Sequence, residues 1–260
     1  MQAVYAFFGG GPQSAAPTEI ELRALRYCNL VLNGQYREAY DELRADKSVA
    51  DEDKKKLMSA VSAALLHFRN LEWTNHGIEK TFRYWNRSEK ETYLRQAQAI
   101  ADELKRLTPF VALGFGAVLG LVRDRDFVPH DDDMDLIIAF EEPMKFAEAK
   151  DLVKAHLEKA GYVCHGQNLS HFGVNTGKGR AVDVFIGFVE DDRVSWFPSA
   201  RRNLQLWDVF PAEKADLFGI ELDVPCDAEA YLSATYGEDW RKPIVNFSHP
   251  WDARQYRDFM

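Results

Sequence analysis

The chain has 260 residues, of which 46% are hydrophobic and 28% charged, and its formal net charge is -9. This composition is typical of a folded protein and excludes a disordered one. The negative charge argues against nucleic acid as a partner, since nucleic-acid-binding proteins gather Lys and Arg. The negative charge does not exclude small phosphorylated ligands, because one cation can outweigh it locally, within a Debye length of about 10 Å.

The sequence shows no sign of export or of a membrane anchor. The three cysteines, Cys28, Cys164 and Cys226, are widely spaced and form no CxxC motif, which favours neither a disulfide framework nor a zinc site. The N-terminus has no basic segment of the signal-peptide kind. The longest apolar stretch, 110–122, is too short to span a bilayer. We therefore expect a soluble, cytoplasmic protein with no transmembrane segment.

The first hundred residues predict helices. Capping-box pairs, Thr18 with Glu21 and Ser88 with Glu91, begin the first and last of them, and Gly34 ends the first. Apolar residues recur at helical spacing in each. The expected helices cover about 18–33, 36–44, 52–70 and 88–107. We expect residues 1–105 to form a helical N-terminal region that packs on the rest of the protein or binds a partner.

From Phe110 onward, short β-rich runs alternate with helices. A helix is predicted over about 143–160, and a late one over 228–236 begins at Asp227 and ends at Gly237. The predicted strands are 110–114, 134–140, 162–165, 171–175, 181–188, 193–197 and 220–224. This order predicts an α+β or α/β fold with a mixed β-sheet and flanking helices over residues 106–260.

Three acids in this second region predict a metal site. Asp133 and Asp135 open an apolar strand and lie two residues apart, so their carboxylates share one face at a spacing of about 7 Å. Met134, Leu136 and Ile138 then face the other side. Asp183 is the only acid inside the apolar run 181–188, where it needs a partner. A divalent cation shared by Asp133, Asp135 and Asp183 satisfies all three.

A glycine-rich segment and an arginine precede these acids. Gly114, Gly116 and Gly120 surround a short apolar run that is expected to turn from strand to helix at Gly116, where backbone N–H groups suit phosphate. Arg123 could clamp the same phosphates. Together with the acids, this pattern favours phosphoryl or nucleotidyl transfer.

Each motif also has a simpler interpretation. The run DDDMD could be a solvated loop, the glycines could only relieve packing, and Arg123 could pair with Asp124 or Asp126. An EF-hand is rejected because its sixth position, which requires glycine, is Leu136.

The stretch LGLVRDRDFVPHDDDMDLII, with VDVF at 182–185 and YLSATYGEDWRKP at 231–243, resembles the LicD family, which includes phosphocholine transferases and fukutin-related proteins. The resemblance covers roughly residues 105–250. It implies a nucleotidyltransferase fold for the catalytic domain, 106–260. The chain departs from the family pattern at Gly116-Ala117, where Ser or Thr usually follows Gly, and at Asp126 and His130.

The resemblance also implies an activity. A phospho-alcohol such as phosphocholine, phosphoglycerol or phosphoribitol would pass from a CDP-linked donor to a glycan hydroxyl, with release of CMP. Asp133, Asp135 and Asp183 would be catalytic and bind Mg²⁺ or Mn²⁺, and Asp183 could also accept the proton of the hydroxyl. The backbone at Gly116 and Ala117, with Arg123, would hold phosphate, while Asp131 and Asp132 shape the metal loop.

Two other functions remain open from the sequence. A nucleotidyltransferase that moves NMP from an NTP to a small molecule or protein would use the same three acids. A non-catalytic module that binds glycan or protein would need none of them, and their presence argues against it.

Overall fold

The computed structural model describes residues 19–244, 247, 249 and 252–260, and contacts divide them into two units. One unit holds the residues up to Trp85 together with 129–132, and the other holds 86–128 and the residues from Asp133 on. The helix that follows Trp85 thus belongs with the sheet, whereas the sequence placed the boundary near residue 105. Thr18 and the N-terminal segment considered as a signal peptide lie outside the described residues.

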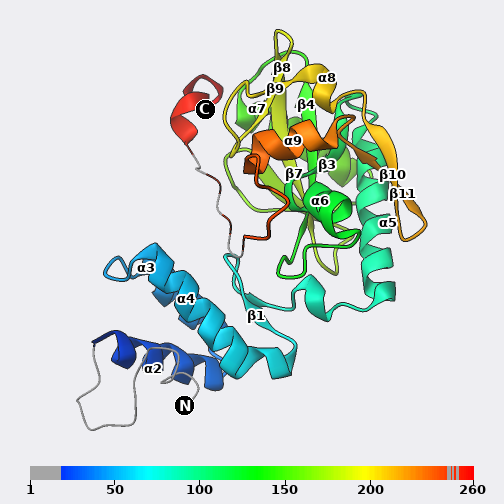
Figure 1. The fold of residues 1–260 in the computed structure, drawn as a ribbon. Helices are drawn as coiled ribbons and strands as arrows, with labels where there is room; N and C mark the ends of the chain where they lie inside the picture. The colour runs from blue at the N-terminus through cyan, green and yellow to red at the C-terminus, as the bar shows by residue number, and fades with distance from the viewer. Residues whose placement is uncertain (1–18, 245–246, 248, 250–251) are drawn as a thin grey trace. The chain divides into compact units, whose positions relative to one another are not determined.

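The N-terminal unit is built mainly from helices (Figure 1). They are α2 (Glu19–Leu32), α3 (Tyr36–Ala45) and α4 (Asp51–Val61), the last extended by a π turn (Ser62–Leu66) and a 3-10 turn (His67–Arg69). Their apolar faces enclose a core that includes Val31, Ala39 and Leu66.

The N-terminal region is helical, as the sequence predicts, and a two-stranded hairpin that the sequence did not predict follows these helices. Strands β1 (Glu72–Trp73) and β2 (Ile78–Glu79) pair antiparallel, and a 3-10 turn (Phe82–Tyr84) comes next. The backbone N–H groups of Phe82 and Arg83 donate to the carbonyls of Asp131 and Pro129, at 2.9 and 2.8 Å. These bonds attach the segment 129–132 to this unit.

The second unit is a mixed sheet with helices around it, as the sequence predicts. Its strands are β3 (Val111–Gly114), β4 (Met134–Phe140), β5 (Val163–His165), β6 (His171–Asn175), β7 (Val182–Glu190), β8 (Arg193–Trp196) and β9 (Leu204–Gln205). The order is β3-β4-β7-β6-β5, with β8 beside β7 and β9 beside β8. Only β4 and β7 run parallel; the other pairs in this sheet are antiparallel.

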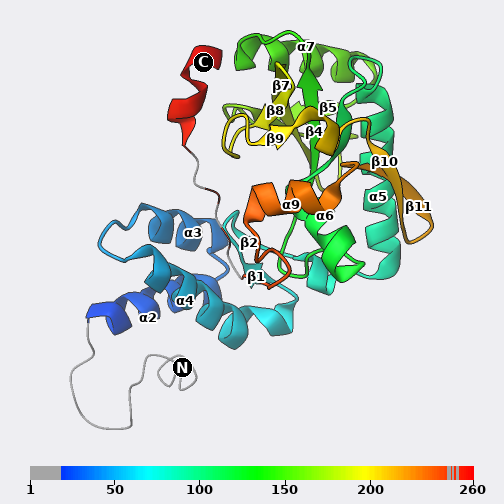
Figure 2. The same cartoon turned by 45° about the horizontal axis from the view of Figure 1, so that its top comes forward.

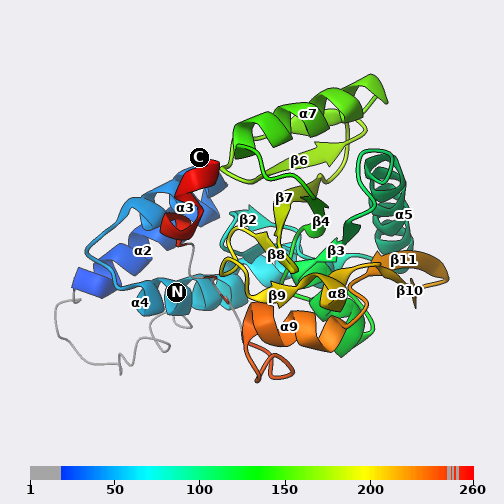
Figure 3. The ribbon, with the colours of Figure 1, turned by 90° about the horizontal axis from the view of Figure 1, so that it is seen from above.

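Helices and one separate hairpin flank this sheet. The helices are α5 (Arg87–Leu104), α6 (Phe115–Leu119) with its π turn (Gly120–Asp124), α7 (Phe146–Lys159), α8 (Leu206–Val209) and α9 (Ala228–Tyr236), and a 3-10 segment (Ala253–Phe259) follows. Helices α5 and α7 pack beside each other, and α6 packs against α9 (Figure 3). The hairpin of β10 (Glu213–Leu217) and β11 (Ile220–Val224) runs along α5 (Figures 1 and 2).

Helix ends follow local chemistry. As predicted, Asp227 begins α9 by accepting a hydrogen bond from the Ala230 N–H at 2.9 Å. The predicted capping box of Ser88 and Glu91 was wrong by two residues, because the box is formed by Asn86 and Glu89. Among the described residues, no helix is both long and apolar enough to cross a lipid bilayer.

Strand β7 packs tightly against β8 at Gly187. A Cβ atom at this position would lie 2.3 Å from the Ser195 carbonyl oxygen and 2.5 Å from the Trp196 ring. That ring is itself fixed, because its Nε1–H donates to the Ile138 carbonyl at 2.7 Å. No side chain larger than hydrogen fits here without moving a strand.

We therefore predict that Gly187→Ala lowers the free energy of unfolding by about 1–3 kcal/mol, the usual cost of overpacking a core. Urea unfolding followed by circular dichroism measures the change. An unchanged midpoint would show that β7 and β8 are not in this close contact.

Candidate functional site

The three predicted acids come together at one end of the β4–β7 pair. Asp135 and Asp183 are direct neighbours in the parallel register, and Asp133 lies two residues before Asp135, immediately ahead of β4. Each carboxylate offers an oxygen within 4.8 Å of those of the other two. A strand pair that the sequence could not specify has thus placed the third acid beside the first two.

Burial makes it unfavourable for these three neighbouring carboxylates to carry their negative charges without a cation. Asp135 is only 9% exposed, and Asp133 and Asp183 are half-buried. All residues of β4 are buried, so the sheet is covered on the Asp face as well as on the face of Met134, Leu136 and Ile138. Like charges held this close with little water favour a bound cation. Oxygen donors of this kind suit hard divalent ions such as Mg²⁺, so the residues fit the expected metal.

Strand β6 leaves space for the third carboxylate. Gly173 pairs with Asp183 across the sheet. A Cβ at Gly173 would lie 3.2 Å from the Asp183 Oδ1 and 3.1 Å from the Ala181 Cβ, which is tighter than an ordinary contact. The absence of a side chain at Gly173 therefore lets Asp183 keep its position in the cluster.

The glycine-rich segment begins beside the acids. Gly114, the last residue of β3, pairs with Asp135. The chain then turns into α6 at Phe115, one residue before the predicted position, with a positive φ of 40°. A non-glycine residue held there is strained. The strained peptide is held by the Tyr231 hydroxyl, which accepts a hydrogen bond from the Phe115 N–H at 3.0 Å. Complete burial raises the pKa of Tyr231.

Aromatic side chains hold the Phe115 ring as well. It packs on Phe185 of β7 and on His249, with ring centroids 4.7 and 5.3 Å apart. Burial lowers the pKa of His249 to about 4, so its imidazole is neutral at physiological pH. The turn is thus supported by uncharged rings.

Packing explains two of the three glycines. A Cβ at Gly114 would lie 2.6 Å from the Ile137 side chain, and one at Gly120 would lie 2.6 Å from the Asp126 carbonyl and 2.8 Å from the Val128 nitrogen. Gly116 and Ala117 lie between them, in the first turn of α6, and Ala117 is half-buried. The simpler interpretation of the glycines therefore holds for Gly114 and Gly120.

Arg123 is paired within its own segment. Its Nε and Nη2 donate to the two carboxylate oxygens of Asp124 at 2.9 and 2.8 Å, so one of the pairings considered from the sequence is present. The arginine side chain is largely buried. Its charge is held in place near the end of α6 and partly balanced by Asp124.

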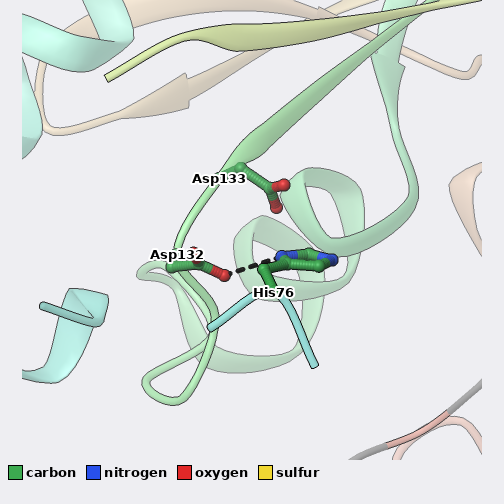
Figure 4. A group of neighbouring side chains, drawn as sticks. All are labelled: His76, Asp132 and Asp133. Atoms are coloured by element: carbon green, nitrogen blue, oxygen red, sulfur yellow. Dashed lines mark hydrogen bonds and ion pairs between the residues drawn. The ribbon is translucent and has the colours of Figure 1, made fainter. Parts of the chain in front are cut away.

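Asp131 and Asp132 precede the cluster and belong to the N-terminal unit. Asp131 accepts from the Asp132 N–H at 3.0 Å. The carboxylate of Asp132, a residue that is only 4% exposed, accepts a hydrogen bond from the His76 Nδ1 at 2.9 Å (Figure 4). His76 lies between β1 and β2 and was not predicted as a site residue. No motif marks it in the sequence, because 56 residues separate it from its partner.

Comparison with known proteins agrees with this geometry. Residues 110–227 match the family model described as the LicD/FKTN/FKRP nucleotidyltransferase domain. The mouse (Mus musculus) protein named ribitol-5-phosphate transferase FKTN is 30% identical over 156 residues, which are 56% of this chain and 32% of the relative. The chain thus spans about a third of that relative's length.

Two solved structures of the antibiotic-resistance factor ANT(2'')-Ia are similar at a lower level. The crystal structure with adenylyl-2''-tobramycin is 18% identical, with a TM-score of 0.36, over 52% of this chain and 67% of that one. The solution structure is 15% identical, with a TM-score of 0.41, over 65% and 82%.

The family match spans all three clustered acids, Gly116, Ala117 and Arg123. Over residues 110–227, the chain is thus similar to the LicD/FKTN/FKRP nucleotidyltransferase domain.

Proposed function

We propose that this protein transfers a phospho-alcohol from a CDP-linked donor to a glycan hydroxyl. The observation that carries the proposal is the cluster of Asp133, Asp135 and Asp183 within a domain similar to that of this family. Of the three head groups expected from the sequence, phosphoribitol is favoured, because the mouse relative is named a ribitol-5-phosphate transferase.

We propose that the three carboxylates hold Mg²⁺ or Mn²⁺. When bound, such an ion supplies positive charge that offsets the charge developing on the transferred phosphate. In the reaction, the acceptor oxygen forms a bond to the phosphorus of the head group as the bond from that phosphorus to CMP breaks. The proton of the hydroxyl must leave at the same time, and Asp183 is positioned among the acids to accept it.

Phosphate binding is assigned to the segment that follows β3. Ala117 has no hydroxyl, so its contribution and that of Gly116 would come from backbone N–H groups. Arg123 already uses Nε and Nη2 for Asp124. We propose that it binds a donor phosphate with Nη1, or by exchanging the carboxylate of Asp124 for phosphate, which is also a bidentate partner.

Asp131 and Asp132 are assigned a supporting role in the loop that leads into β4. The hydrogen bond from His76 holds the Asp132 carboxylate in one orientation. Asp133, the first acid of the cluster, is the next residue in the chain.

Nucleotide preference tests the donor. We predict that CDP with Mg²⁺ raises the melting temperature more than CTP, ATP or UDP, and that CDP without metal has little effect. A ligand at 100 times its Kd stabilises the folded state by about 2.7 kcal/mol. CMP release from CDP-ribitol, CDP-glycerol and CDP-choline would then identify the head group. A preference for CTP or ATP would instead indicate nucleotidyl transfer, and no response to any nucleotide would favour a binding module.

Replacement of one acid tests the metal site. We predict that Asp135→Asn leaves the metal-free protein equally or more stable, because it removes one of three neighbouring like charges. The stabilisation by Mg²⁺ should disappear, and CMP release should fall more than about 100-fold, since even residues behind metal ligands alter affinity by 10–100-fold. Thermal unfolding with and without Mg²⁺ measures the first effect.

Asp151→Asn, on the exposed surface of α7, is the matched control for this replacement. It changes the net charge equally and should keep the full response to Mg²⁺. An Asp135→Asn protein that still responds to Mg²⁺ and turns over would refute the assignment of the metal site.

A further inference from the structure

A helix outside the matched domain reaches the carboxylate cluster. Helix α5 ends at Leu104, before residue 110, where the family match begins. It carries Tyr93, a residue that is only 3% exposed. Burial and the nearby carboxylate of Asp133 raise the pKa of its phenol, which therefore keeps its proton.

The Tyr93 hydroxyl joins the two strands that carry the acids. It accepts a hydrogen bond from the Met134 N–H at 3.0 Å and donates one to the Ala181 carbonyl. Met134 lies between Asp133 and Asp135, and Ala181 lies two residues before Asp183. The first paired residues of β4 and β7 are Met134 and Val182, so the hydroxyl spans the pair where it begins.

Neighbouring residues on the same face of α5 hold the same region. Lys90 and Gln96 are spaced three residues on either side of Tyr93, and side chains at this spacing are neighbours on a helix. The Lys90 ammonium contacts the Asp126 carboxylate at 2.7 Å, and the Gln96 amide donates to the Arg180 carbonyl at 2.9 Å. The Tyr93 ring is nearly parallel to the Phe127 ring, and the centroids of the two rings are 6.4 Å apart. The helix is thus fixed on both sides of the hydroxyl.

We propose that Tyr93 is a positioning residue, whose hydroxyl fixes the spacing between the backbone that bears Asp133 and Asp135 and the backbone that bears Asp183. The proposal rests on the function proposed above, in which these acids share one ion. Hydrogen bonds behind a set of ligands set the geometry of those ligands. A single hydroxyl that bonds both backbones can set their relative position without touching the ion or the substrate.

The test compares Tyr93→Phe with Tyr256→Phe. Tyr256 is a matched control, because it is also buried and its hydroxyl donates to one backbone carbonyl, that of Ser199, at 2.9 Å. Both variants lose one buried hydroxyl, and their stabilities are compared by urea unfolding. Mn²⁺ binding is measured by electron paramagnetic resonance. Turnover of the CDP-alcohol is measured as CMP release at saturating Mn²⁺.

We expect Tyr93→Phe to weaken Mn²⁺ binding by about 10-fold or more, as residues behind metal ligands do. Its kcat should fall while KM for the donor changes little, because the phosphate-binding segment is retained. Tyr256→Phe should keep wild-type Mn²⁺ affinity and kcat. Wild-type affinity and kcat in Tyr93→Phe would overturn the proposal and leave Tyr93 a structural residue.

A second variant keeps the proposal testable if Tyr93→Phe does not fold. Gln96→Leu removes the donor to the Arg180 carbonyl and keeps the size of the side chain, and we expect a smaller loss of Mn²⁺ affinity, of a few-fold. An unchanged affinity in Gln96→Leu would then count against α5 as the positioning element. Failure of the proposed function is recognised separately, since wild-type protein would then bind no Mn²⁺, or would bind Mn²⁺ but release no CMP.

Discussion

The parallel pairing of β4 with β7 is the constraint on which the site depends. Its register sets Asp135 beside Asp183 and brings Asp133 to the same end of the two strands. A shift of one residue in either strand would send its acids to the opposite face of the sheet. Tyr93 bonds the backbone where this strand pair begins, and Gly173 leaves room beside it for Asp183.

That arrangement places negative charge where little water reaches. Asp135 is almost completely buried, so the cluster is costly unless a cation joins it. Gly173 leaves room for Asp183, and uncharged aromatic rings rather than acids support the turn at Phe115. Burial and close spacing make three charged carboxylates unfavourable without a cation. The same burial and spacing would make them effective ligands for a divalent ion.

Elements on both sides of the matched domain support its strands. Tyr93, from α5, bonds the backbones of Met134 and Ala181, and Tyr231, from α9, accepts from the Phe115 N–H. Both hydroxyls are buried and bond backbone groups, so their effect is on the position of the main chain. Residues 110–227 therefore carry the acids, while flanking helices fix where the acids lie.

Local chemistry made much of this protein predictable from its sequence. Strand β4 has the predicted bounds, and the alternation of side chains along it places Asp133 and Asp135 on one face. Helix α9 begins and ends at the predicted residues because capping is a contact between neighbours in the chain. Asp183 is the only acid in an apolar run, and this isolation predicted that its carboxylate has a partner. The capping box of α5 lies two residues before the predicted pair, because Asn86 caps a helix as well as Ser88 does.

Only the tertiary structure decided what depends on residues distant in the chain. One such contact is the β4–β7 register, which pairs two separate strands. The others are the hydrogen bond from His76 to Asp132 and the two bonds of the Tyr93 hydroxyl, which join residues 41 to 88 positions apart. No spacing or composition encodes such contacts, because they form only when the chain packs.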